Sequence, residues 1–360
     1  MNKIFKILIL TFYFNDLFSA NAIIDLYGVD EPIASKIIRQ SNANIQRYVE
    51  MESNMRAVSP DKMDDALSKH LKLHDQIINQ IKKYGDFSFV DISIIYYPDK
   101  NTRYTTIDIV PSSEMFRIPN PPKRKIDKEL VLNTETKNLF KLWSRYNEDN
   151  ISLINKGTFS SKQQACPVVH CIWGFDKKEL NEYLPKFRTL ASKNINQLKN
   201  FIRLSSNDEE RGDAIFLLAH SDDYRSTASF LFDYVNDESA VVRNNSLRVI
   251  AGILSTHKID DLPLQKIIEA LNYPLVTDRN KAANVLYHAT HNDATTHEQI
   301  ITGAGNILVN LLKLKQPNNH NPAYLTLKEI SHQNYSEYDY QHWQEWIDSR
   351  KNELNKPKRI

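Results

Sequence analysis

Two cysteines lie five residues apart in the segment CPVVHC, and His170 stands directly before the second. In an oxidising compartment Cys166 and Cys171 can close a local disulfide if the segment turns, and we expect that bond, with two buried thiols as the alternative. A zinc site would need a second ligand pair at a matching distance, which the sequence lacks. A thiol nucleophile is not favoured, because catalytic cysteine and histidine residues are usually remote in sequence and oxidation would remove the thiol.

The other histidine groups match metal sites only in part. His70 and His74 lie four residues apart in a predicted helix without an evident third ligand, so a solvated helix face is expected. His288, His291 and His297 lie near a predicted helix corner, where polar residues are common. The sequence contains no Gly-x-Ser-x-Gly elbow, Walker loop, dinucleotide fingerprint or His-Glu-x-x-His helix. We predict no catalytic, cofactor-binding or metal-binding residue. We therefore expect a binding protein in preference to an enzyme.

Composition narrows the class of protein. The chain has 46 basic and 44 acidic residues and a formal net charge of +2, which gives no electrostatic reason to expect a nucleic-acid partner. Only 8 of its 360 residues are glycine, whereas about 7% is usual. This scarcity disfavours phosphate-binding glycine loops and turn-rich β folds, so a mostly helical protein is expected.

Residues 1 to 22 have the pattern of an export signal. Lys3 and Lys6 precede the apolar run from Ile7 to Phe14, and Ala20-Asn21-Ala22 places small residues where signal peptidase reads them. The apolar run is shorter than the roughly 20 residues that span a bilayer. We predict cleavage after Ala22, a periplasmic or secreted location, and no integral membrane segment after cleavage.

The segment from residue 23 to residue 110 is predicted to be a small α+β module. Periodicity and helix-start signals indicate a strand, two helices and a β-hairpin. These elements are expected at Ile23–Tyr27, Asp30–Ser53, Pro60–Tyr84, Phe87–Tyr97 and Thr102–Val110. This order of elements resembles that of POTRA domains, the periplasmic modules that accompany outer-membrane barrels.

Residues 111 to 128 contain four prolines and the basic triplet Lys123-Arg124-Lys125, a composition typical of an extended linker. Three like charges beside prolines favour a solvated segment, and contact with phosphate or lipid headgroups is the alternative. We place a domain boundary here. A helical segment from 129 to 189 should follow, with Leu139, Trp143 and Tyr146 packed against the helices beyond it.

Internal similarity is the strongest signal in the chain. One pattern restarts three times: an arginine, a small residue three positions later, and two apolar residues six and seven positions later. The arginines are Arg211, Arg243 and Arg279, the small residues are Ala214, Ser246 and Ala282, and the apolar pairs are Leu217-Leu218, Val249-Ile250 and Val285-Leu286. Helical spacing places these positions on one face. A single unit cannot bury that face alone, so the units must stack.

This pattern resembles HEAT-like repeats, most clearly from Asp237 to Ser246, where an acidic helix start leads into valine, arginine and then a small residue. The resemblance covers residues 190 to 350 and implies a C-terminal α-α solenoid, followed by a polar tail from 351 to 360. We expect the arginines to join adjacent repeats through Asp208, Asp237 and Asp278. Lining a binding surface is their alternative role.

A terminal cap is predicted between Tyr335 and Ile347. Four aromatic side chains should cover the last repeat there, and an aromatic interaction surface is the alternative. They are Tyr338, Tyr340, Trp343 and Trp346.

These features predict a mostly α, exported protein of bacterial type. Its small α+β module and HEAT-like solenoid are expected to bind one or more protein partners as a non-enzymatic scaffold or adaptor, without a cofactor. One alternative is an enzyme or accessory subunit with a site at the junction of module and solenoid, near Cys166 to Trp173. Another is a secreted effector that acts on a host protein.

Overall fold

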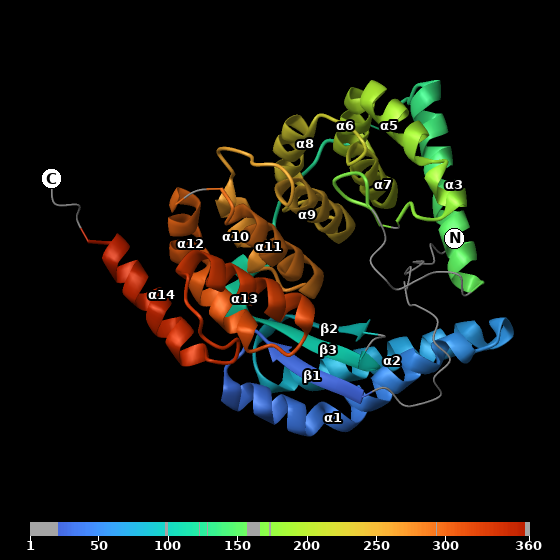
Figure 1. The fold of residues 1–360 in the computed structure, drawn as a ribbon. Coiled ribbons are helices and arrows are strands. Elements are labelled where there is room, and N and C mark those ends of the chain that lie inside the picture. The colour runs from blue at the N-terminus through green and yellow to red at the C-terminus, as the bar shows by residue number, and fades with distance from the viewer. Residues whose placement is uncertain are drawn as a thin grey trace.

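The computed structural model describes residues 21–97, 100–121, 123–127, 129–156, 166–172, 174–292 and 294–356. Almost all of the predicted signal peptide lies outside these residues. The described chain is mostly helical and contains a small three-stranded sheet, as the composition predicts (Figure 1). No helix in these ranges combines the length and the apolar character needed to cross a membrane.

The elements of the N-terminal segment follow in the predicted order. They are β1 (Asn21–Tyr27), α1 (Glu31–Asn54), α2 (Met63–Ile81), β2 (Phe87–Tyr97) and β3 (Thr102–Pro111). The side chain of Asp30 accepts a hydrogen bond from the Ile33 amide at the start of α1, where Pro32 is tolerated in the first turn. The predicted start of this helix is therefore confirmed.

The sheet has the strand order β1-β3-β2. β2 and β3 form the predicted antiparallel hairpin, and β1 pairs with β3 in parallel, which the sequence did not predict. Ile107 and Ile109 of β3 pack on the α1 and α2 side. Because side chains alternate along a strand, Thr106 and Asp108 face the opposite side, where they are also buried. The sheet is therefore covered on both faces.

From residue 134 onward the described chain is helical, apart from its connections. It begins with α3 (Thr134–Asn155), α4 (Lys178–Asn181), α5 (Leu184–Lys193), α6 (Ile195–Leu204), α7 (Asp208–Leu218), α8 (Tyr224–Leu231) and α9 (Ala240–Leu254). It continues with α10 (Leu264–Leu271), α11 (Val276–Ala289), α12 (Ala294–Leu312), α13 (Pro317–Ser331) and α14 (Tyr340–Leu354). Leu139, Trp143 and Tyr146 of α3 are buried in the helical core, as predicted.

The later helices form two layers. α7, α9, α11 and α13 pack side by side in chain order, and we call them the first layer (Figure 1). α8, α10 and α12 pack against this layer, and α14 closes the end by packing on α12. α3 and α5 cover part of α7 at the opposite end.

The sequence pattern keeps one register along the first layer. Its arginine is the fourth residue of α7, α9 and α11, and the small and apolar positions that follow are all buried. α13 continues this register with His320 as its fourth residue, followed at the equivalent positions by Ala323, Thr326 and Leu327, all buried. The threefold pattern of the sequence does not include this helix, because histidine stands where the other three helices have arginine.

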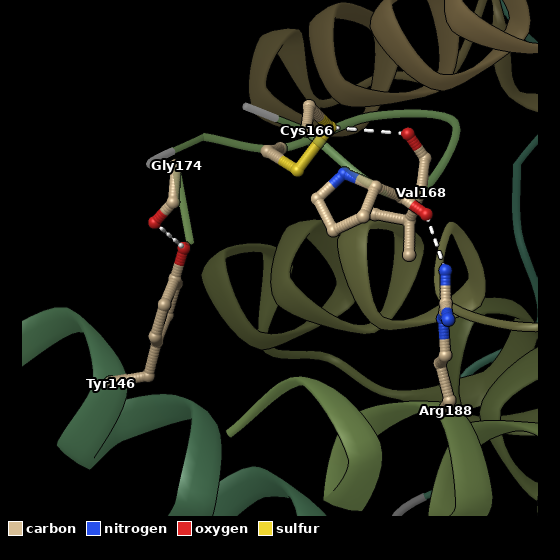
Figure 2. The surroundings of a disulfide bond; sticks show 7 residues. Tyr146, Cys166, Val168, Gly174 and Arg188 are labelled. Atoms are coloured by element: carbon tan, nitrogen blue, oxygen red, sulfur yellow. Dashed lines mark hydrogen bonds between the residues drawn. A yellow bond between two sulfur atoms is a disulfide. The ribbon is translucent and has the colours of Figure 1, made fainter. Parts of the chain in front are cut away.

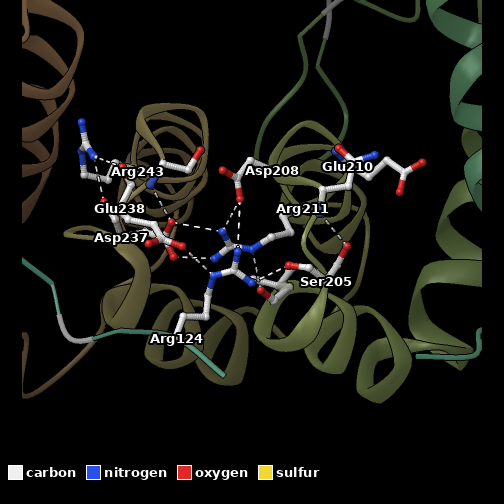
Figure 3. A network of polar contacts seen from close by, with 11 residues as sticks. Arg124, Ser205, Asp208, Glu210, Arg211, Asp237, Glu238 and Arg243 are labelled. Atoms are coloured by element: carbon white, nitrogen blue, oxygen red, sulfur yellow. Dashed lines mark hydrogen bonds and ion pairs between the residues drawn. The ribbon is translucent and has the colours of Figure 1, made fainter. Parts of the chain in front are cut away.

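The segment from 111 to 128 differs from the solvated linker that was expected. A short 3₁₀ helix, Ser112–Arg117, follows β3, and the Asp127 amide donates to the Leu204 carbonyl at 2.9 Å. The side chain of Arg124 is only 12% exposed and binds Asp208 and Glu238 (Figure 3). The acidic residues at the helix starts attract this guanidinium, whereas Lys123 and Lys125 remain exposed.

The C-terminal aromatic residues act as a cap and offer little surface. Trp343 is fully buried and donates from Nε1 to the Ser336 carbonyl at 2.9 Å. Tyr340 and Trp346 pack against the helical core, while Tyr338 is 67% exposed. The alternative prediction, that Trp343 belongs to an aromatic interaction surface, is therefore wrong. Its ring covers the end of the second layer, which needs an apolar cover.

Candidate functional site

Buried arginines and acids join neighbouring helices of the first layer. Arg211 of α7 binds Asp208 in its own helix at 2.8 Å and Asp237, which lies just before α9. Arg243 of α9 binds Asp278 of α11 at 2.8 Å. Asp237 and Asp278 join adjacent helices as expected, whereas the contact of Asp208 with Arg211 lies within α7. We call these pairs, together with the pairs Arg279–Asp108 and His320–Glu337 described below, the ladder.

Arg279 differs from the other two arginines because its acid comes from the N-terminal sheet. Its guanidinium binds Asp108 of β3 at 2.7 Å, and both side chains are buried. The same guanidinium lies over the ring of Tyr27 in β1, 4.2 Å from the ring centre. Burial raises the pKa of Asp108 to about 6, although the charge of Arg279 opposes that shift. The sheet therefore supplies the acid of this pair.

Further hydrogen bonds beside the Arg279–Asp108 pair join the N-terminal segment to the helices. The Asp25 carboxylate of β1 accepts from the Lys315 and Gln316 amides, at 2.8 and 2.9 Å, where α13 begins. Arg117 donates to the Asn272 carbonyl at 3.1 Å. The last pair of the ladder joins His320 of α13 to Glu337 at 3.1 Å. Sequence reasoning missed Asp108 and Asp25, because nothing local links a strand to a helix far along the chain.

The CPVVHC segment forms a closed loop on α7 and α9. A disulfide joins Cys166 and Cys171, whose Cα atoms lie 5.7 Å apart (Figure 2). Arg188 of α5 donates to the Pro167 carbonyl. The Val169 carbonyl lies so close to Gly252 of α9 that a Cβ there would come within 1.9 Å of its oxygen. Only glycine permits this approach.

The ring of His170 stacks on Phe216 of α7, with ring centres 5.2 Å apart. We call this side of the first layer the loop-bearing face. The described contacts of the loop are with α5, α7 and α9, whereas the sheet contacts the region around α11 and the start of α13. The alternative site near Cys166 to Trp173 therefore does not coincide with the junction of module and helices, and Trp173 lies outside the described residues.

The loop-bearing face carries two cations without an acid. Arg248 lies one turn before Gly252 on α9, and its buried Nε has no hydrogen-bond partner. Asn244, one turn earlier, has a buried side-chain nitrogen that is also unpartnered. Lys281 comes from the adjacent α11, and neither cation forms an ion pair with a carboxylate of the described residues. We call Asn244, Arg248 and Lys281, together with His170, the cationic cluster.

Electrostatics show that these groups influence one another. Burial, followed by the charge of Arg248, lowers the pKa of Lys281 to about 8. Burial, followed by the charges of Arg248 and Lys281, lowers the pKa of His170 to about 3, so its imidazole is neutral at pH 7. Strongly shifted pKa values grouped on one face are typical of functional sites. Chemically, this arrangement offers positive charge and free donors to an anion.

A second polar group lies nearby under α3 and α5. Trp143 donates from Nε1 to Asp213 of α7 at 2.8 Å, and burial raises the pKa of that carboxyl group to about 6. His220, at the end of α7, is buried among aromatic rings, and burial lowers its pKa to about 3. α7 ends at Leu218, shortly before His220, and Asp223 caps the next helix by accepting a hydrogen bond from the Ser226 amide.

The other histidine groups do not assemble a metal site. His70 stacks on Tyr48 with ring centres 4.2 Å apart, and the rings of His288 and His291 lie 6.3 Å apart. Within the described ranges, no group of three or more histidine, cysteine, aspartate or glutamate side chains could hold a metal ion. Comparisons with protein-family models, with curated proteins and with solved structures gave no match.

Sequence reasoning did not select Arg248 or Lys281. Arg248 follows the ladder residue Arg243 by five positions and Lys281 follows Arg279 by two, so both fall outside the repeated pattern. A comparison of equivalent positions in α7, α9 and α11 could have selected Arg248. The residue that corresponds to Arg248 is Phe216 in α7 and Asn284 in α11, so a charge there is peculiar to α9.

Proposed function

We propose that this protein is an exported, non-enzymatic scaffold in which HEAT-like repeats present the loop-bearing face to a protein partner. The observation that carries the proposal is the shared register of α7, α9, α11 and α13. Equivalent residues of side-by-side helices form rows, and such rows make an extended surface suited to another chain. The disulfide fits an oxidising location outside the cytoplasm.

The α+β module, which resembles POTRA domains, contributes to this scaffold by holding the far end of the first layer. Asp108 completes the ladder at Arg279, and Asp25 binds the start of α13. Module and repeats therefore act as one binding unit.

An affinity capture from bacterial envelope extract tests the proposal. The bait is the mature chain, residues 23–360, and the test variant is Asn284→Arg, which enlarges a half-buried residue on the loop-bearing face of α11. Gln265→Arg makes the same kind of change on exposed α10, in the second layer. We expect a specific protein to be enriched by the unaltered chain and by Gln265→Arg and lost with Asn284→Arg. Equal capture by both variants, or no enriched protein, would contradict the proposal.

A further inference from the structure

Arg248 is unlike the arginines of the ladder. Arg211, Arg243 and Arg279 are buried and each binds a carboxylate. The Nε of Arg248 is also buried, although the residue as a whole is half-buried, and the described residues give this guanidinium neither a carboxylate nor a hydrogen-bond acceptor. Taking part of a cation out of water without a counter-charge is costly. No carboxylate of the described residues offsets that cost.

The repeat pattern does not require a cation at this place. At the equivalent position, α7 has Phe216 and α11 has Asn284. For Lys281, the equivalent residues are Asp213 in α7 and Asn245 in α9. The first position is thus filled by an aromatic or an amide side chain, and the second by an acid or an amide. Two adjacent cations on neighbouring helices are therefore not explained by packing.

Free donors surround the two cations. Asn244 lies one helical turn from Arg248 on the same face of α9, and its side-chain nitrogen is buried without a partner. The Nε2 atom of His170 is likewise buried and unpartnered, and the disulfide loop that carries it is fixed against Gly252. Its low pKa keeps this ring neutral, so it adds polarity to the cluster without further charge. These polar atoms lie on a helix and on a closed loop, which are rigid supports.

We propose that Arg248 and Lys281, assisted by Asn244, bind carboxylate side chains of an acidic, extended segment of the partner. The inference rests on the proposed scaffold function and names the chemistry that its loop-bearing face recognises. Arginine pairs well with carboxylates because its donors match the two oxygens.

The two cations come from different helices, which suits a partner segment that carries more than one carboxylate. α9 and α11 are direct neighbours, and each contributes one cation. In an extended chain, alternate side chains point the same way and lie about 7 Å apart. Two acidic residues separated by one residue can therefore offer one carboxylate to each cation.

Fluorescence anisotropy with a labelled peptide of alternating Glu and Ser tests this inference on the mature chain. We expect this peptide to bind, the matched Gln and Ser peptide to fail, and affinity to fall with added salt. Arg248→Met and Lys281→Met should each weaken binding by about 30-fold or more, the effect of removing one partner from a buried charge pair. Arg225→Met, which removes an arginine that is 69% exposed on α8, should leave affinity unchanged.

Two results would overturn the inference. One is unchanged peptide affinity in Arg248→Met and Lys281→Met, with the folding of each variant checked by its thermal transition. The other is displacement of the peptide by inorganic phosphate at concentrations similar to that of the peptide, which would indicate a small-anion site. If the envelope partner is lost with Asn284→Arg but still captured by Arg248→Met, the scaffold function stands and the carboxylate site is wrong.

Discussion

The ladder and the cationic cluster place the same kind of side chain in opposite surroundings. In the ladder, Arg243 meets Asp278, and Arg279 meets Asp108 from another part of the chain. In the cluster, Arg248 lies one turn beyond Arg243 in α9, Lys281 lies two residues beyond Arg279 in α11, and neither has a carboxylate partner among the described residues. Where an arginine serves the architecture, the fold supplies its acid. Where the acid is missing, we infer that a partner supplies it.

Breaking a ladder pair should have the largest effect on stability. Asp278→Ala leaves Arg243 buried with no counter-charge, which typically costs about 3–5 kcal/mol in the free energy of unfolding. Urea unfolding followed by circular dichroism measures this change. As the control, Asp260→Ala removes the acid of an exposed pair with Arg225, and we expect a change below about 1 kcal/mol. Similar losses in both variants would show that the buried pairs are not special.

Displacing the disulfide loop should lower the free energy of unfolding by less than breaking a ladder pair does. Gly252→Ala places a Cβ against the rigid backbone of Val169, so the loop must shift, at a cost of about 1–3 kcal/mol. Gly303→Ala in α12 is the matched control, because its Cβ would meet only the flexible end of Ile268. We expect this control to be neutral or stabilised by up to about 1 kcal/mol through better helix propensity. Equal unfolding free energies for the two variants would contradict the close contact of loop and helix.

The buried histidines predict how stability changes with pH. The folded pKa of His220 is lowered to about 3, so its contribution is complete above the unfolded pKa near 6.5 and is lost as pH falls below it. His220→Phe removes this penalty. Between about pH 7.5 and about pH 5.5, the variant should gain about 1 kcal/mol relative to the unaltered chain. Parallel pH profiles of unfolding would show that His220 titrates normally.

The carboxyl groups of Asp108 and Asp213 act in the opposite direction. Their folded pKa values are raised to about 6, so their contribution is greatest at low pH and is lost as pH rises through 6. Comparing the unaltered chain with His220→Phe at the same pH cancels this effect, because both proteins retain Asp108 and Asp213.

Local patterns predicted the helices, the hairpin and the register of the ladder. The spacing of Arg211, Arg243 and Arg279 was visible because each arginine has the same place in its own helix. The parallel pairing of β1 with β3 and the contact of Asp108 with Arg279 join residues far apart in the chain. No local pattern encodes such contacts, so they could not be predicted.

The cationic cluster was missed for a related reason. In the sequence alone, Arg248 and Lys281 have no feature that separates them from ordinary surface residues. Their significance depends on partial burial and on the missing acid, and both are properties of the folded chain. The sequence therefore predicted the frame of the site better than its chemistry.

The most direct measurement compares the unfolding free energies of Arg243→Met and Arg248→Met. Both variants replace an arginine of α9 by an apolar side chain of similar length. We expect Arg243→Met to lose about 3–5 kcal/mol, because Asp278 is left buried and unpaired. Arg248→Met should be unchanged within about 1 kcal/mol or more stable, because an unpaired and partly buried charge is removed. A loss in Arg248→Met as large as that in Arg243→Met would show that Arg248 serves the fold and would contradict the account.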